Sequence, residues 1–169
     1  GGKIALELND GDRLVGVDLT DGDRDVMLVS NGGKAVRFAE KDVRPTGRTS
    51  RGIRGIRLGA GQKVISLIAV DDNKKILTAT ENGYGQRTKT SAYRSQGRGG
   101  QGVRAIMLSE RNGKLVGGTQ VNDDDEALMI TSHGTMVRIR VNEVSVVGRN
   151  TQGVRLIQPT LGEAIVVTG

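Results

Sequence analysis

The chain has 169 residues, a formal net charge of +6 and no cysteine. That length suits one domain with an adequate core, and the lack of cysteine excludes disulfides and thiolate metal sites. No apolar run approaches the ~18 residues of a membrane span and no secretory signal pattern opens the chain, so we expect a cytoplasmic protein without a membrane partner.

Short segments rich in Val, Ile and Leu, bounded by Gly, Asn or Asp, predict β-strands. In the first part of the chain we expect them at about 14–17, 26–30, 34–38 and 53–58. No segment keeps a helical period over ten residues or more. Four antiparallel strands in about 50 residues are typical of a propeller blade, so we predict an all-β fold.

Glycines show that this pattern repeats along the chain. One set closes each unit at intervals of 50, 50 and 51 residues: Gly2, Gly52, Gly102 and Gly153. A second set lies in the expected hairpin turns: Gly33, Gly83 and Gly134. We predict a single repeat domain over 1–169, with full repeats at about 11–58, 61–108 and 112–158 and partial repeats at 1–10 and 160–169.

Charge follows the same period. The second halves of the repeats, 34–58, 84–108 and 135–158, contain 17 of the 25 Lys and Arg residues but only 3 of the 19 Asp and Glu residues. Solvated strands often carry basic side chains, but a segregation that recurs with the fold favours a basic stripe along one rim. Such a stripe predicts a polyanion as partner.

The scarcity of aromatic residues narrows the choice among possible polyanionic partners. Phe38, Tyr84 and Tyr93 are the three aromatic residues, whereas readers of single-stranded nucleic acids stack bases on aromatic platforms. Duplex backbone binding needs only Lys, Arg, small polar groups and backbone N–H donors. We therefore expect duplex DNA, held through its phosphates.

The most distinctive loop is Gln96-Gly-Arg-Gly-Gly-Gln-Gly102. It resembles the Q-R-R-G-G-K-G box of the C-terminal domain of the DNA gyrase A protein, with Gly97 and Gln101 in place of two basic residues. Segments across the rest of the chain resemble blades of the same family: Val15–Thr20, Gly52–Leu58, Asn82–Gly85 and Val147–Gly153.

This resemblance implies a β-pinwheel of four-stranded blades that exchange strands with their neighbours. It also implies duplex DNA wrapped around a basic outer perimeter, in support of ATP-dependent negative supercoiling by the holoenzyme. The partners would be the rest of the gyrase A protein and, through the holoenzyme, the gyrase B protein, close to the nucleoid. The two lost basic residues weaken the expected phosphate contact at the loop.

The chain has no P-loop motif and no recognisable breakage–reunion domain, so we expect no catalytic residue, cofactor or metal in it. The expected DNA-contact residues are the basic side chains of the stripe together with the polar and glycine positions of the loop. They are Lys34, Arg37, Arg44, Arg48, Arg51, Arg87, Lys89, Arg94, Gln96, Arg98, Gly99, Gly100, Gly102, Arg138, Arg140 and Arg149. Arg54, Arg104 and Arg155 precede expected core positions and are interpreted as blade anchors instead.

We expect structural rather than catalytic or metal-binding roles for the remaining candidate residues. His133 is expected in an exposed turn, Asp123–Glu126 lacks the ligand spacing of an EF-hand, and Tyr84 and Tyr93 have no neighbouring base that would activate them. Exposed edges at Gly2–Leu8 and Glu163–Val167 predict self-association or a substitute strand. The alternatives are the related domain of topoisomerase IV and a protein-binding β-propeller.

Overall fold

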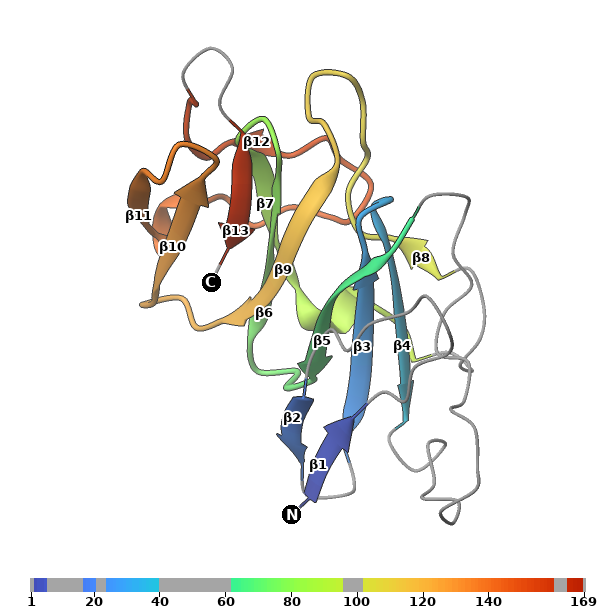
Figure 1. Ribbon diagram of the computed structural model, residues 1–169. Helices are drawn as coiled ribbons and strands as arrows, with labels where there is room; N and C mark the ends of the chain where they lie inside the picture. Colours follow the sequence, from blue (N-terminus) through green and yellow to red (C-terminus); the bar gives the residue numbers. More distant parts are fainter. Residues whose placement is uncertain are drawn as a thin grey trace.

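The computed structural model describes residues 2–5, 17–20, 24–39, 62–95, 102–159 and 164–168 (Figure 1). Their strands are β1 (Gly2–Ala5), β2 (Val17–Thr20), β3 (Asp25–Ser30), β4 (Lys34–Ala39), β5 (Val64–Ala69), β6 (Lys75–Thr80), β7 (Tyr84–Lys89), β8 (Val103–Arg104), β9 (Leu115–Val121), β10 (Glu126–Thr131), β11 (Met136–Arg140), β12 (Val154–Arg155) and β13 (Ile165–Thr168). Two 3-10 turns, η2 (Thr90–Ala92) and η3 (Val141–Glu143), are the helical elements of this described part. The predicted all-β class is confirmed.

The strands form antiparallel sheets that follow one another across the molecule (Figure 1). Two sheets have four strands, in the orders β5-β3-β4-β8 and β12-β7-β6-β9, and a third has the order β11-β10-β13. The strands expected at 26–30 and 34–38 are β3 and β4. The segment expected at 14–17 is described only from residue 17, where β2 begins, and the one at 53–58 lies outside the described residues.

With the predicted repeat bounds, each four-stranded sheet takes both of its edge strands from the following repeat. Strand β8 pairs with β4 so that Arg104 lies opposite Lys34. In the next sheet β12 pairs with β7, and Arg155 lies opposite Tyr84. This is the strand exchange that the resemblance implied, and it means that neither four-stranded sheet is built from one repeat alone.

The hairpin turns explain the regular glycines. Gly83 has a φ of +89°, a conformation that side chains with a Cβ rarely adopt. Its N–H donates to the Thr80 carbonyl at 3.1 Å, and a Cβ there would collide with the backbone of Ile157. Gly33 and Gly134 have the same positive φ at the same place in their hairpins.

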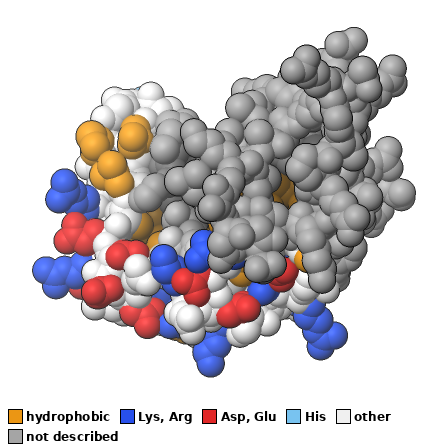
Figure 2. Space-filling view, turned by 90° about the horizontal axis from the view of Figure 1, so that it is seen from below, with side chains coloured by type: hydrophobic (Ala, Val, Ile, Leu, Met, Phe, Trp, Pro, Cys, Tyr) orange, Lys and Arg blue, Asp and Glu red, His pale blue; other side chains and the backbone are white. Residues whose placement is uncertain are grey.

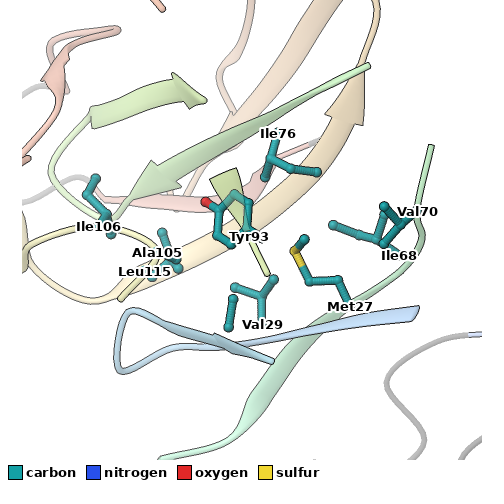
Figure 3. Packing of buried hydrophobic residues seen from close by; sticks show 10 residues of the cluster. Met27, Val29, Ile68, Val70, Ile76, Tyr93, Ala105, Ile106 and Leu115 are labelled. Atoms are coloured by element: carbon teal, nitrogen blue, oxygen red, sulfur yellow. The ribbon is translucent and has the colours of Figure 1, made fainter. Parts of the chain in front are cut away.

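The core lies between sheets rather than within one repeat. Figure 3 shows Met27 and Val29 of the first sheet facing Ile76 of the second, with Tyr93 in the middle and Ile106 to the left. A second cluster joins the second and third sheets: Leu77, Val121, Ala127, Val141 and Val144. Each sheet therefore buries its apolar face against the neighbouring repeats, as a repeat architecture requires.

Candidate nucleic-acid interface

The structure describes nine of the residues expected to contact DNA: Lys34, Arg37, Arg87, Lys89, Arg94, Gly102, Arg138, Arg140 and Arg149. The other seven lie outside the described residues: Arg44, Arg48, Arg51, Gln96, Arg98, Gly99 and Gly100. Most of the box-like loop is thus among the latter. The nine described residues divide into anchored and exposed groups.

Arg37 joins the first two sheets. It lies on β4, but its Nη1 donates to Asp72 at 2.8 Å and to the carbonyls of Thr90 and Tyr93, which belong to the next repeat. Its Nε donates to Asp25 at 2.7 Å. Only 11% of the side chain is exposed, so its hydrogen bonds are made inside the protein.

Arg87 repeats this arrangement 50 residues later. On β7, its Nε donates to the Val144 carbonyl at 2.8 Å, and its Nη1 donates to Asp123 at 2.9 Å. Asp123 also accepts from Lys75 at 2.8 Å. Each of the two arginines therefore reaches an aspartate in the turn before the next hairpin and a carbonyl at the next 3-10 turn. We call this arrangement the inter-repeat latch.

The carboxylates of the latch are stabilised in their charged form. The hydrogen bond from Arg37 lowers the pKa of Asp72, and the same bond raises the pKa of Arg37. The pKa of Asp123 is lowered by its hydrogen bond from Lys75 and, to a smaller extent, by the charge of Arg87. Both ion pairs are therefore fully charged near neutral pH.

Arg149 organises a group of exposed cations. Its Nε donates to the Ala92 carbonyl at 2.8 Å and its Nη1 to the Arg104 carbonyl at 2.9 Å. These bonds bring together the backbone beside Arg94 and the edge strand β8, and both Arg94 and Arg104 are exposed. We call Arg94, Arg104 and Arg149 the outer basic cluster. It contains two residues expected in the stripe and one that was interpreted as an anchor.

The other expected contacts differ in exposure. Lys89 and Arg140 are exposed, Lys34 is half-buried, and the side chain of Arg138 is 78% exposed. Gly102 lies against the carbonyl of Ala35 with a φ of +82°, so its role in the structure is to let β8 approach β4 closely.

Sequence reasoning set aside Arg155, which the structure places on the surface of edge strand β12. Its guanidinium lies 4.1 Å from the centre of the Tyr84 ring, and so does that of Arg111. Arg155 also donates to the Tyr84 hydroxyl and to the Asn82 carbonyl. Arg155 lies opposite Tyr84, whereas Arg104 in the preceding sheet lies opposite Lys34. This tyrosine was a signal in the sequence that could have marked Arg155, because an aromatic ring orients neighbouring cations by cation–π contact.

The face shown in Figure 2 is not uniformly basic. Lys and Arg side chains alternate there with Asp and Glu side chains over the part of the chain that the structure describes. The latch carboxylates are accessible to solvent, since the Asp72 and Asp123 side chains are more than half exposed. Exposed cations that form no short ion pair with the described residues, such as Arg94 and Arg104, are the better candidates for phosphate contacts.

The remaining candidates lie in turns or in the core, and Asp123 also belongs to the latch. His133 is in an exposed turn, and the run that starts at Asp123 forms a turn in which Asp125 accepts from the Asn122 N–H at 2.7 Å. Burial raises the pKa of Tyr93, which keeps its hydroxyl neutral. Within the described ranges, no cluster of His, Cys, Asp and Glu has a metal-binding arrangement, and no helix is long and apolar enough to cross a membrane.

Comparison with known proteins identifies the family. The family described as "DNA gyrase C-terminal domain, beta-propeller" matches residues 1–21, 24–71, 74–122 and 125–167. The chain is 56% identical over 165 residues to the DNA gyrase A protein of Klebsiella oxytoca and 54% identical to that of Escherichia coli K12. Each alignment covers 98% of this chain and 19% of the relative, so the chain spans about a fifth of their length.

Solved structures agree on the fold. A structure of the DNA gyrase A C-terminal domain superposes with a TM-score of 0.85 at 27% identity, covering 96% of this chain and 56% of the other. The C-terminal domain of DNA topoisomerase IV gives a TM-score of 0.88 at 23% identity, covering 96% and 51%, which supports the shared fold alone. From its sequence and its sheets, the chain belongs to the family of DNA gyrase C-terminal β-propeller domains.

Proposed function

We propose that this chain binds duplex DNA by its phosphates and bends it, as the non-catalytic wrapping domain of a DNA gyrase A protein. The holoenzyme, with the rest of the gyrase A protein and with the gyrase B protein, would use that bend in ATP-dependent negative supercoiling. Such a function places the chain in the bacterial cytoplasm, at the nucleoid. Membership of the gyrase C-terminal domain family is the observation that carries the proposal.

The described basic residues suggest which side chains would contact the DNA phosphates and which would position the sheets. Arg94 and Arg104 are exposed, and Arg149 connects the backbone at Ala92 with that at Arg104. An exposed arginine is suited to phosphate oxygens. Arg155, Lys89 and the β11 cations would extend the contact along the array. Arg37 and Arg87 would act indirectly, by fixing the angle between neighbouring sheets.

A salt titration tests the binding mode. If each engaged repeat neutralises two or three phosphates, log K should fall with log[salt] with a slope of roughly −5 to −8. Reversing Arg94 and Arg104 to Glu should reduce affinity at least ~10-fold and make the slope shallower by about 2. The matched control reverses Arg24 and Lys74, which lie in the acidic halves of the repeats, and should change little. Equal losses in both pairs, or a flat salt response, would contradict a localised phosphate contact.

Bending needs a separate measurement, because binding alone does not wrap DNA. Bending a 20–30 base-pair site by tens of degrees costs on the order of 1–6 kcal/mol, which added contacts must offset. Energy transfer between dyes at the two ends of a short duplex should rise on saturation with the chain. An end-to-end distance that stays at the value of straight DNA would make the chain a binder without wrapping activity.

A further inference from the structure

Two arginines share one aromatic ring at the edge of the second four-stranded sheet. The guanidinium carbons of Arg111 and Arg155 each lie 4.1 Å from the centre of the Tyr84 ring, so they are no more than twice that distance apart. Tyr84 lies on β7, Arg155 on the paired strand β12, and Arg111 in the turn before β9. The ring attracts both cations and thereby joins three segments of the chain.

Neither guanidinium is neutralised by a carboxylate in the described part of the chain. Arg111 donates to the Gln152 carbonyl at 3.1 Å and to the side-chain oxygen of Asn112 at 3.3 Å. Arg155 donates to the Asn82 carbonyl at 2.9 Å. The further acceptors of both arginines are backbone carbonyls and the ring hydroxyl. All these acceptors are uncharged, whereas each latch arginine reaches an aspartate.

Both arginines also keep N–H groups for a ligand. They are exposed, and the Tyr84 ring between β12 and the turn is half-buried. Among the described residues, Nη1 of Arg111 and Nε of Arg155 have no acceptor. Two positive charges held close together repel each other, and an anion that contacts both would offset that repulsion. A planar guanidinium matches the oxygens of a phosphate group particularly well.

The sequence pattern does not reveal this pair, because Arg111 lies outside the basic halves of the repeats. The preceding sheet has no equivalent ring, since Lys34 takes the place of Tyr84 opposite Arg104. The contact of two arginines with one tyrosine, rather than the net charge of a segment, therefore marks the position.

We propose that Tyr84, Arg111 and Arg155 form a binding site for one phosphate group, with Tyr84 as the positioning residue. The two guanidinium groups donate their remaining N–H groups to the phosphate oxygens, and the ring holds both side chains in place. A phosphate of bound duplex DNA and a free phosphate compound offer the same chemistry. The DNA source rests on the proposed function, whereas the site itself does not.

Inorganic phosphate tests the site in the absence of DNA. Titrated into the chain at constant ionic strength, it should cause saturable NMR shifts at the Nε–H groups of Arg111 and Arg155. Tyr84→Phe keeps the ring and should preserve these shifts, whereas Tyr84→Leu keeps the net charge and should abolish their saturation. The exposed Arg94 has no ring to position it and should shift linearly. A linear response at all three arginines would overturn the proposal.

A duplex of about 25 base pairs identifies the source of the phosphate. Arg111→Ala, in an exposed turn, should lower the affinity for this duplex roughly 3- to 10-fold and make the slope of log K against log[salt] shallower by about 1. Lys114→Ala removes an exposed cation of the same segment that has no contact with the ring, and is the matched control. It should change the affinity less than about 2-fold.

The two measurements separate the possible failures. If phosphate saturates the site but Arg111→Ala binds the duplex as the wild type does, the ligand is a free phosphate compound. Equal losses from Arg111→Ala and Lys114→Ala would overturn a DNA contact at this site, because any neighbouring cation would then serve. A wild-type chain that does not bind the duplex would refute the proposed function, and the phosphate titration would still decide the site.

Discussion

Strands β7 and β11 hold the same position in successive hairpins but have opposite surroundings. On β7, Arg87 is buried and joins Asp123 to the carbonyl of Val144. On β11, Arg138 extends from an edge strand and is mostly exposed. The same residue type at the same repeat position is therefore a structural anchor in one hairpin and an accessible cation in the other. The neighbouring repeat, rather than the residue itself, decides which role it has.

Substitutions at the turn glycines should give the largest difference in stability between the two hairpins. Gly83→Ala forces a Cβ into the backbone of Ile157 at a φ of +89°, so it should destabilise the chain by about 3 kcal/mol or more. Gly134→Ala has the same strained backbone but open space, and should cost about 1 kcal/mol. Urea unfolding followed by circular dichroism measures both. Equal losses would show that crowding by the next repeat is unimportant.

The arginines should show a smaller difference of the same sign. Arg87→Met keeps the aliphatic stem but leaves the Val144 carbonyl without its donor, and should cost about 2–3 kcal/mol. Arg138→Met, at an exposed position, should change stability by less than about 0.5 kcal/mol. Arg87→Lys is a useful third variant, because it keeps the charge and loses the planar fork. Full stability of Arg87→Met would contradict the latch.

The smallest effect concerns pH. Lys75 and Arg87 lower the pKa of Asp123, so this carboxylate adds stability at pH values above its unfolded pKa of ~3.9. That added stability is lost as the pH falls through the folded pKa. The difference in unfolding midpoint between the wild type and Asp123→Asn should thus be present at pH 6 and absent near pH 2. Because Asp123 is exposed, the shift should be small, and a pH-independent difference would contradict an ionic cause.

The turns and the repeat could be predicted from the sequence because their requirements are local. A hairpin that needs a positive φ selects glycine wherever it occurs, so Gly33, Gly83 and Gly134 reveal the period directly. The positions of edge strands β8 and β12 could be predicted for the same reason, because each follows a glycine with a positive φ, Gly102 and Gly153. Counting strands between such markers was sufficient for the all-β repeat fold.

The roles of individual arginines could not be predicted in this way. Charge segregation placed Arg87 in the stripe and set Arg155 aside as an anchor, yet Arg87 is buried and Arg155 is exposed. The difference arises from contacts about 57 residues away along the chain, such as the Val144 carbonyl that accepts from Arg87. Net charge along a sequence does not contain that information, whereas the recurrence of Asp72 and Asp123 before successive hairpins was a usable signal.

The exchange of edge strands also delays the completion of each sheet during protein synthesis. Ala35 on β4 pairs with Val103, and Gly85 on β7 pairs with Val154, so each sheet waits for almost 70 further residues before its edge is covered. At a synthesis rate of about 5–20 residues per second, β4 stays uncovered for roughly 3–14 s after it leaves the ribosome. An uncovered strand can pair with another chain during that interval. The nascent protein is therefore most vulnerable to misassembly while it is still being translated.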